Sequence, residues 1–251
     1  MVNITLPDGS IKKFKSETNA LEVAMSISEG LARQCIAAKV NNELTDLTTT
    51  IRENATIELL TSKSEGSLDI LRHTTAHVFA QALTRLFPKA LITIGPSTEQ
   101  GFFYDVDYED LTDADLPKIE QEMQKIIKEN LEVTKSFKTL KEAKEHFKNN
   151  TYKLEIIEAI EKGSLNEEEK DEGSISDEGL QFYSQGDFSD ICRGPHLPKT
   201  GMIKAFKLER ITKAYWRGNA ENKQLNRIYG SAFWKKTEME EYYAMLEEAK
   251  K

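Results

Sequence analysis

VNITLPDGSIKKF, residues 2–14, is the stretch that decides the fold of the N-terminal part of the chain. Apolar and polar residues alternate on both sides of Pro7-Asp8-Gly9, as they do in half-buried β-strands. Proline, aspartate and glycine are the residues that tight turns favour, each for its own backbone reason. The stretch therefore predicts a β-hairpin.

A small unit can be built outward from this hairpin. An amphipathic helix is expected at about residues 20–31, followed by two β-rich runs that read CIAAKV (residues 35–40) and ATIELL (residues 55–60). The order of hairpin, helix and strands predicts a compact β-grasp (ubiquitin-like) domain over residues 1–62. We see no cluster of catalytic or metal-ligating residues there, so we expect this domain to bind or to act as a spacer.

Composition places the chain among globular proteins. Its 251 residues suffice for one large or two ordinary domains, and 39% of them are hydrophobic and 30% charged. The first 30 residues lack the pattern of a signal peptide, and no run approaches the roughly 18 apolar residues that a membrane span requires. We therefore expect a cytoplasmic protein without a membrane partner. Cys35 and Cys192 lie far apart, so no disulfide framework is expected.

Charge is unevenly distributed. The net charge is −8, but residues 190–236 contain eleven Lys and Arg against three Asp and Glu, a balance of +8 that leaves −16 for the remainder. Contact with a phosphate backbone depends on local rather than total charge. The basic segment is thus compatible with binding to a nucleic acid. The alternative is a basic surface that only contacts solvent.

A second, larger α+β domain with an antiparallel sheet is expected after the polar linker TSKSEG at residues 61–66. It begins with a helix at about residues 67–87, on which His73 and His77 lie nearly opposite the apolar stripe. GFFYDVD, residues 101–107, predicts a strand, and helices are expected at residues 116–131 and from Thr139. The acidic run at residues 161–179 predicts a mobile loop.

Two pentads carry the candidate chemistry, HTTAH at residues 73–77 and CRGPH at residues 192–196. Positions four apart on a helix face the same way, so His73 and His77 can point at one place. A turn at Gly194-Pro195 can bring His196 back toward Cys192 and Asp190. The resulting cluster can bind zinc, organise a water for hydrolysis without a metal, or only pack. Residue types and spacing leave these alternatives open.

Four stretches in order resemble a known family. They are HTTAHVFAQAL, IGPSTEQGFFYDVD, DICRGPHLPKTG and the pair AYWRGN and LNRIYGSAFW. Following a β-grasp domain, they resemble the N-terminal part of bacterial-type threonyl-tRNA synthetases over essentially the whole chain. The resemblance implies a TGS domain at residues 1–62, an editing domain (second additional domain) at 63–240, and the start of a linker helix to a synthesis domain at 241–251.

The resemblance implies a proofreading region that hydrolyses seryl-tRNA(Thr) and lacks the aminoacylation core. A synthesis site for threonine rejects serine weakly, because a missing methyl group is worth only about 1–3 kcal/mol. His73 is expected to activate water, Lys153 to stabilise the oxyanion, and Asp190 to hold the serine α-ammonium. The expected catalytic residues are His73, His77, Lys153, Cys192 and His196, and the expected substrate-binding residues are Tyr104, Asp190, Arg193, Arg217 and Arg227.

Cofactor and partner expectations follow from the same resemblance. We expect no cofactor for editing, with zinc as the alternative. The expected partner is the acceptor end of tRNA(Thr) carrying serine, and a full-length synthetase is expected to be a homodimer through its synthesis domain. Two other functions stay open: a free-standing, zinc-dependent deacylase of the alanyl type and a non-enzymatic tRNA-binding module.

Overall fold

The computed structural model describes all 251 residues, which form two compact units. The first contains Met1–Ile70 and Gly194–Pro198, and the second contains Leu71–Arg193 and Lys199–Lys251. Each combines helices and strands, so the expected α+β class is confirmed. None of the helices has the length and apolar character needed to cross a membrane.

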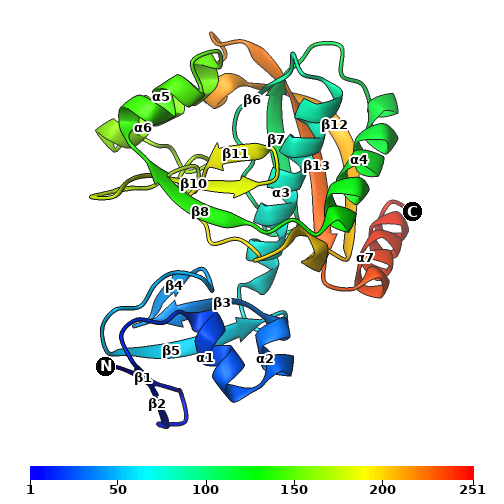
Figure 1. Ribbon diagram of the computed structural model, residues 1–251. Helices are drawn as coiled ribbons and strands as arrows, with labels where there is room; N and C mark the ends of the chain where they lie inside the picture. Colours follow the sequence, from blue (N-terminus) through cyan, green and yellow to red (C-terminus); the bar gives the residue numbers. More distant parts are fainter. The chain divides into compact units, whose positions relative to one another are not determined.

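The first unit is built on a five-stranded mixed sheet with the strand order β2-β1-β5-β3-β4 (Figure 1). Strands β1 and β5 pair in parallel, and the other neighbours are antiparallel. This arrangement confirms the predicted β-grasp domain. Its elements are β1 (Val2–Thr5), β2 (Ile11–Phe14), α1 (Ala20–Ile27), α2 (Glu29–Gln34), β3 (Cys35–Val40), β4 (Glu43–Thr45) and β5 (Ala55–Thr61).

The predicted hairpin is confirmed, with Val2 of β1 opposite Phe14 of β2. Gly9 has a φ of 87°, a left-handed conformation that glycine adopts without steric cost. The backbone N–H of Ser10 donates to Asp8 Oδ1 over 2.9 Å, which fixes the turn. The local sequence therefore sets the register of the first two strands.

The single helix expected at residues 20–31 is two helices, because Ser28 is extended, with φ −165° and ψ 150°. Its backbone N–H still donates to Ala24 at the end of α1, while its hydroxyl accepts the N–H of Leu31 in α2. Serine side chains compete for backbone hydrogen bonds in this way and so favour caps over helix interiors.

The second unit contains two antiparallel sheets, which confirms the expected sheet type. One sheet has the order β12-β13-β7-β6, and the other has the order β11-β10-β8 with β9 beside β10. The strands are β6 (Leu91–Ile92), β7 (Phe102–Asp107), β8 (Thr134–Lys138), β9 (Ile175–Ser176), β10 (Gly179–Gln185), β11 (Phe188–Ile191), β12 (Ala205–Tyr215) and β13 (Gln224–Phe233). The α-helices are α3 (Ser67–Leu86), α4 (Leu116–Glu129), α5 (Leu140–His146), α6 (Thr151–Lys162) and α7 (Lys236–Ala249).

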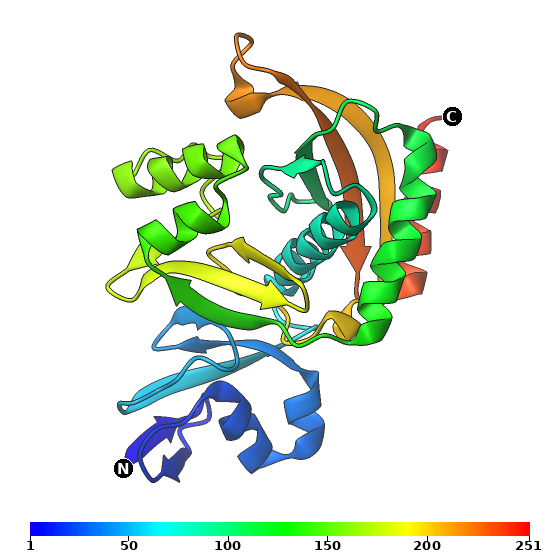
Figure 2. The ribbon, with the colours of Figure 1, turned by 45° about the horizontal axis from the view of Figure 1, so that its top comes forward.

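Helix α3 runs between the two sheets of this unit (Figure 2). The Phe79 ring lies 5.7 Å from that of Tyr104 on β7, and the His77 ring lies 6.0 Å from that of Phe188 on β11. Every residue from 70 to 83 is buried, the polar ones included. His73 and His77, which the apolar pattern places away from the stripe, are therefore buried as well, because the helix has neighbours on every side.

Part of the acidic run at residues 161–179, expected to be a mobile loop, is buried in the second unit. Glu169 is fully buried and accepts a hydrogen bond from Arg217 over 2.8 Å. Asn166 and Glu169 also exchange two backbone-to-side-chain hydrogen bonds, which close a turn. Glu169 therefore forms an ion pair and hydrogen bonds, although it lies in a segment of strongly polar composition.

Candidate functional site

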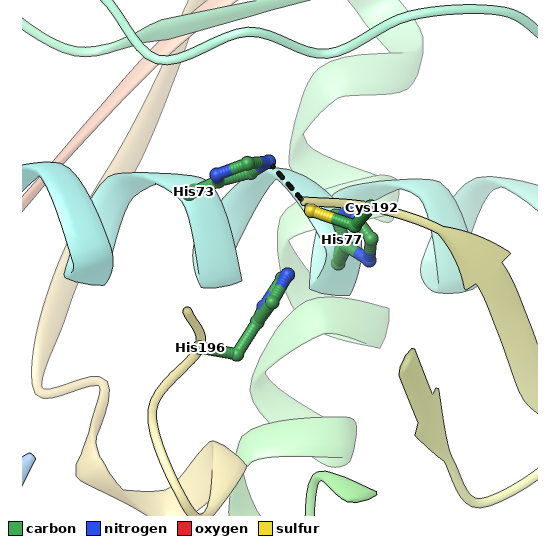
Figure 3. A group of neighbouring side chains, drawn as sticks. All are labelled: His73, His77, Cys192 and His196. Carbon is green, nitrogen blue, oxygen red and sulfur yellow. Dashed lines mark hydrogen bonds between the residues drawn. The ribbon is translucent and has the colours of Figure 1, made fainter. Parts of the chain in front are cut away.

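The two pentads meet in one cluster of four side chains, His73, His77, Cys192 and His196 (Figure 3). Each offers one nitrogen or sulfur atom, and these atoms all lie within 4.8 Å of one another. His73 Nε2 lies 3.2 Å from Cys192 Sγ. All four residues are at least 95% buried. The juxtaposition that the sequence predicted is therefore present.

Local structure explains how each side chain reaches the cluster. His73 and His77 are one turn apart on α3, and their rings meet edge to face at 5.6 Å. Cys192 directly follows β11, which hydrogen-bonds to β10. Within the first unit, the backbone N–H of His196 donates to Asp46 Oδ1 over 3.0 Å. Asp46 was not singled out in the sequence, since nothing local links it to CRGPH.

The donor set fits zinc. Two ligands on one tetrahedral zinc, one nitrogen and one sulfur, would be separated by roughly 3.5 Å, close to the contact between His73 and Cys192. Burial, together with His73 and Lys153, lowers the pKa of His77 well below its usual value, so the ring is neutral, as a metal ligand must be. The expectation of an editing site with no cofactor is contradicted by this buried cluster, which suggests a zinc site.

A second polar group lies close enough to the cluster to act on it electrostatically. Lys153, on α6, is fully buried and its Nζ lies 2.9 Å from Asp190 Oδ2. The Tyr104 hydroxyl is 3.5 Å from the same oxygen. Burial and the charge of Asp190 raise the pKa of Tyr104 well above its usual value, so the phenol stays protonated. The three residues that the resemblance placed in the site are thus brought together.

Glu172 is a member of this group that the sequence did not indicate. It is 94% buried, and its Oε1 accepts the backbone N–H of Gly95 over 3.1 Å. Burial, outweighing the attraction of Lys153, raises the pKa of its carboxyl to about 8. The residue lies in the acidic run that the sequence predicted to be a mobile loop, and one carboxylate among many acidic residues carries no distinguishing signal.

The chain is similar to known proteins along its whole length. Residues 2–61 match the family model described as the TGS domain. Residues 180–229 match the threonyl and alanyl tRNA synthetase second additional domain. All of this chain aligns with curated proteins named threonine--tRNA ligase, at 46% identity for Streptococcus pneumoniae (strain JJA) and 45% for Desulforapulum autotrophicum. The chain matches the N-terminal TGS and editing region of threonyl-tRNA synthetases. It spans 37% of the length of those relatives.

The arginines that the threonyl-tRNA synthetase resemblance singled out differ in their surroundings. Arg227 makes a two-pronged ion pair with Asp105 at 2.8 and 2.9 Å. Arg217 is paired with the buried Glu169. Arg193, in contrast, is exposed and adjacent to Cys192. Of the three, only Arg193 presents an open charge beside the cluster, and the other two hold protein segments together.

Proposed function

We propose that this chain hydrolyses the ester that joins serine to tRNA(Thr). The observation that carries the proposal is the group of buried histidine, cysteine, lysine and carboxylate side chains in a chain similar to the editing region of threonine--tRNA ligases. A synthesis site that accepts threonine discriminates weakly against serine. A second site that excludes the extra methyl group of threonine removes the resulting error.

The chemistry of the residues supports this role. Zinc, when bound by the cluster, would supply a water acidic enough to attack near neutral pH. A hydrolase needs one coordination position for that water, so we propose that three of the four side chains hold the metal and the fourth acts on the water. Lys153 is a fixed cation in a site without bulk water, where it can stabilise the negative charge that develops on the ester oxygen.

Zinc in an amount equal to the protein is expected in chain purified without chelator, as measured by elemental analysis. After replacement by cobalt, a thiolate-to-metal absorption band should appear in the wild type and vanish in Cys192→Ser, because the thiolate is a ligand. Cys35→Ser serves as the control, since this cysteine belongs to the core of the first unit. A wild-type chain that takes up neither metal contradicts the zinc site.

The acceptor end of tRNA(Thr) is the proposed partner. Arg193 and Lys213 are exposed, so both can meet phosphates. The double variant Arg193→Gln/Lys213→Gln is expected to weaken tRNA binding and to reduce the slope of log affinity against log salt by about 0.7 to 0.9 for each lost contact. Filter binding at several salt concentrations measures both quantities.

A matched control for this charge removal is Lys148→Gln on the exposed surface after α5, where the lysine pairs only with Glu145. This variant should bind tRNA as the wild type does. An unchanged slope in the folded double variant would show that these basic residues are only solvated.

Deacylation assays test the proposed function. The wild-type chain should release serine from tRNA(Thr) charged with serine well above the uncatalysed rate. The same assay with serine-charged tRNA(Ala) distinguishes this function from that of an alanyl-type deacylase, which would hydrolyse the tRNA(Ala) ester faster than the tRNA(Thr) ester. Binding of tRNA(Thr) without release of serine from either tRNA would favour the non-enzymatic module and contradict the proposal.

A further inference from the structure

When both of its carboxyl groups are ionised, the charges of the buried polar group do not balance. It contains one lysine, Lys153, and two carboxyl groups, those of Asp190 and Glu172. Lys153 is paired with Asp190 over 2.9 Å. Glu172 has no cation of its own, although a carboxylate that loses its water needs one. A bound ligand with one positive charge would complete the group.

Asp190 is poorly placed to receive such a ligand. Its Oδ2 already binds the Lys153 ammonium and lies 3.5 Å from the Tyr104 hydroxyl. Its Oδ1 accepts the backbone N–H of Ile191 over 2.8 Å. Both oxygens of Asp190 are therefore engaged. The serine α-ammonium, which the sequence-based expectation assigned to Asp190, would have to compete there with the Lys153 ammonium.

Glu172 is held in place and keeps an oxygen for another donor. The N–H of Gly95 binds Oε1, which leaves Oε2 free to accept. Gly95 also lies against Tyr104, since a Cβ atom at this position would overlap the tyrosine ring. Gly95, Tyr104 and Glu172 thus fix one another, so the carboxyl group is oriented before any ligand arrives.

Electrostatics joins this group to the histidine and cysteine cluster. Lys153 lowers the pKa of His77, and Cys192 contributes to the raised pKa of Tyr104. The neighbour of Glu172 in sequence, Asp171, is hydrogen-bonded through its carbonyl to the Cys192 thiol over 3.8 Å. Glu172 is thus next in sequence to a residue whose carbonyl contacts the cluster.

We infer that Glu172 binds the α-ammonium group of the esterified amino acid. The inference rests on the proposed function and deepens it, because it names the part of the substrate that the acidic run 161–179 recognises. Every aminoacyl ester has this ammonium, so Glu172 anchors the amino acid, and selection between serine and threonine falls to the groups around the side chain. The raised pKa of Glu172 without ligand agrees with this role. A buried carboxylate without a neighbouring cation takes up a proton, and a bound ammonium can take the place of that proton.

Two stable analogues test the inference by calorimetric titration. One is adenosine with serine joined to its 3′ position through an amide, and the other carries a hydroxyl group in place of the α-amino group. Glu172→Gln is expected to weaken binding of the amino analogue about 10- to 100-fold and to leave the hydroxyl analogue unchanged. The glutamine keeps an acceptor for the Gly95 N–H, so the fold should persist.

Glu167→Gln is the matched control, since its side chain is 93% exposed in the same acidic run. The inference fails if Glu172→Gln binds the amino analogue as the wild type does, or if it loses affinity equally for both analogues. It also fails, without any variant, if the wild type does not prefer the amino analogue. Failure of the proposed function looks different, because a chain that binds the amino analogue through Glu172 but hydrolyses no seryl-tRNA contradicts only the hydrolysis.

Discussion

His73→Ala is expected to slow the hydrolysis of seryl-tRNA(Thr) by about 100-fold or more in single-turnover assays. The substitution removes the nitrogen that lies 3.2 Å from Cys192 Sγ, and with it one of the four atoms of the cluster. His73 is 95% buried, so the alanine also leaves a gap in the unit and should lower the melting temperature.

His146→Ala is the control for this loss. His146 is exposed on α5, and its ring centroid lies 5.5 Å from that of Phe182. The His146→Ala variant should leave the rate of hydrolysis unchanged. His73→Gln, which fills most of the space of the imidazole, separates lost chemistry from lost packing. Hydrolysis at the wild-type rate by a folded His73→Ala chain would remove His73 from the chemistry.

Lys153→Met should cost about 3–5 kcal/mol of unfolding free energy, because it leaves Asp190 buried without its cation. For a unit of this size the melting temperature should fall by on the order of 10 °C, measured by calorimetry. Removing both charges, in Lys153→Met/Asp190→Leu, should restore much of the stability, since the unpaired charge disappears.

Lys162→Met is the matched control on the same helix. Lys162 pairs with Glu158, but both side chains are at least 60% exposed, so the loss should stay below about 1 kcal/mol. Equal melting temperatures for Lys153→Met and Lys162→Met would show that the buried pair contributes no more than a surface pair.

The sequence predicted those parts of the fold that depend on interactions between residues close together in the chain. The turn at Pro7-Asp8-Gly9 fixes the first hairpin, and the helix expected from Thr139 begins there, where Thr139 and Glu142 form a capping box. His73 and His77 share a helix face because helical spacing requires it. These features depend on residues within one turn or hairpin of each other.

The rest depends on contacts between distant segments. The polar residues of α3 are buried because other elements surround them, as in the reciprocal hydrogen bonding of Gln81 and Gln185. Glu169 and Glu172 are buried because Arg217 and Gly95 meet them across 48 and 77 residues. Composition alone could not distinguish these carboxylates from solvated ones, which is why the buried acidic group emerges only in three dimensions.

Single-turnover release of serine and of threonine from the same tRNA(Thr) tests the central claim most directly. The wild-type chain should hydrolyse the seryl ester at least about 10-fold faster than the threonyl ester, because one methyl group in a close-fitting site is worth about 1–3 kcal/mol. His73→Ala should abolish that difference by slowing the seryl reaction. Equal release of both amino acids, or no release above the uncatalysed rate, would contradict the account.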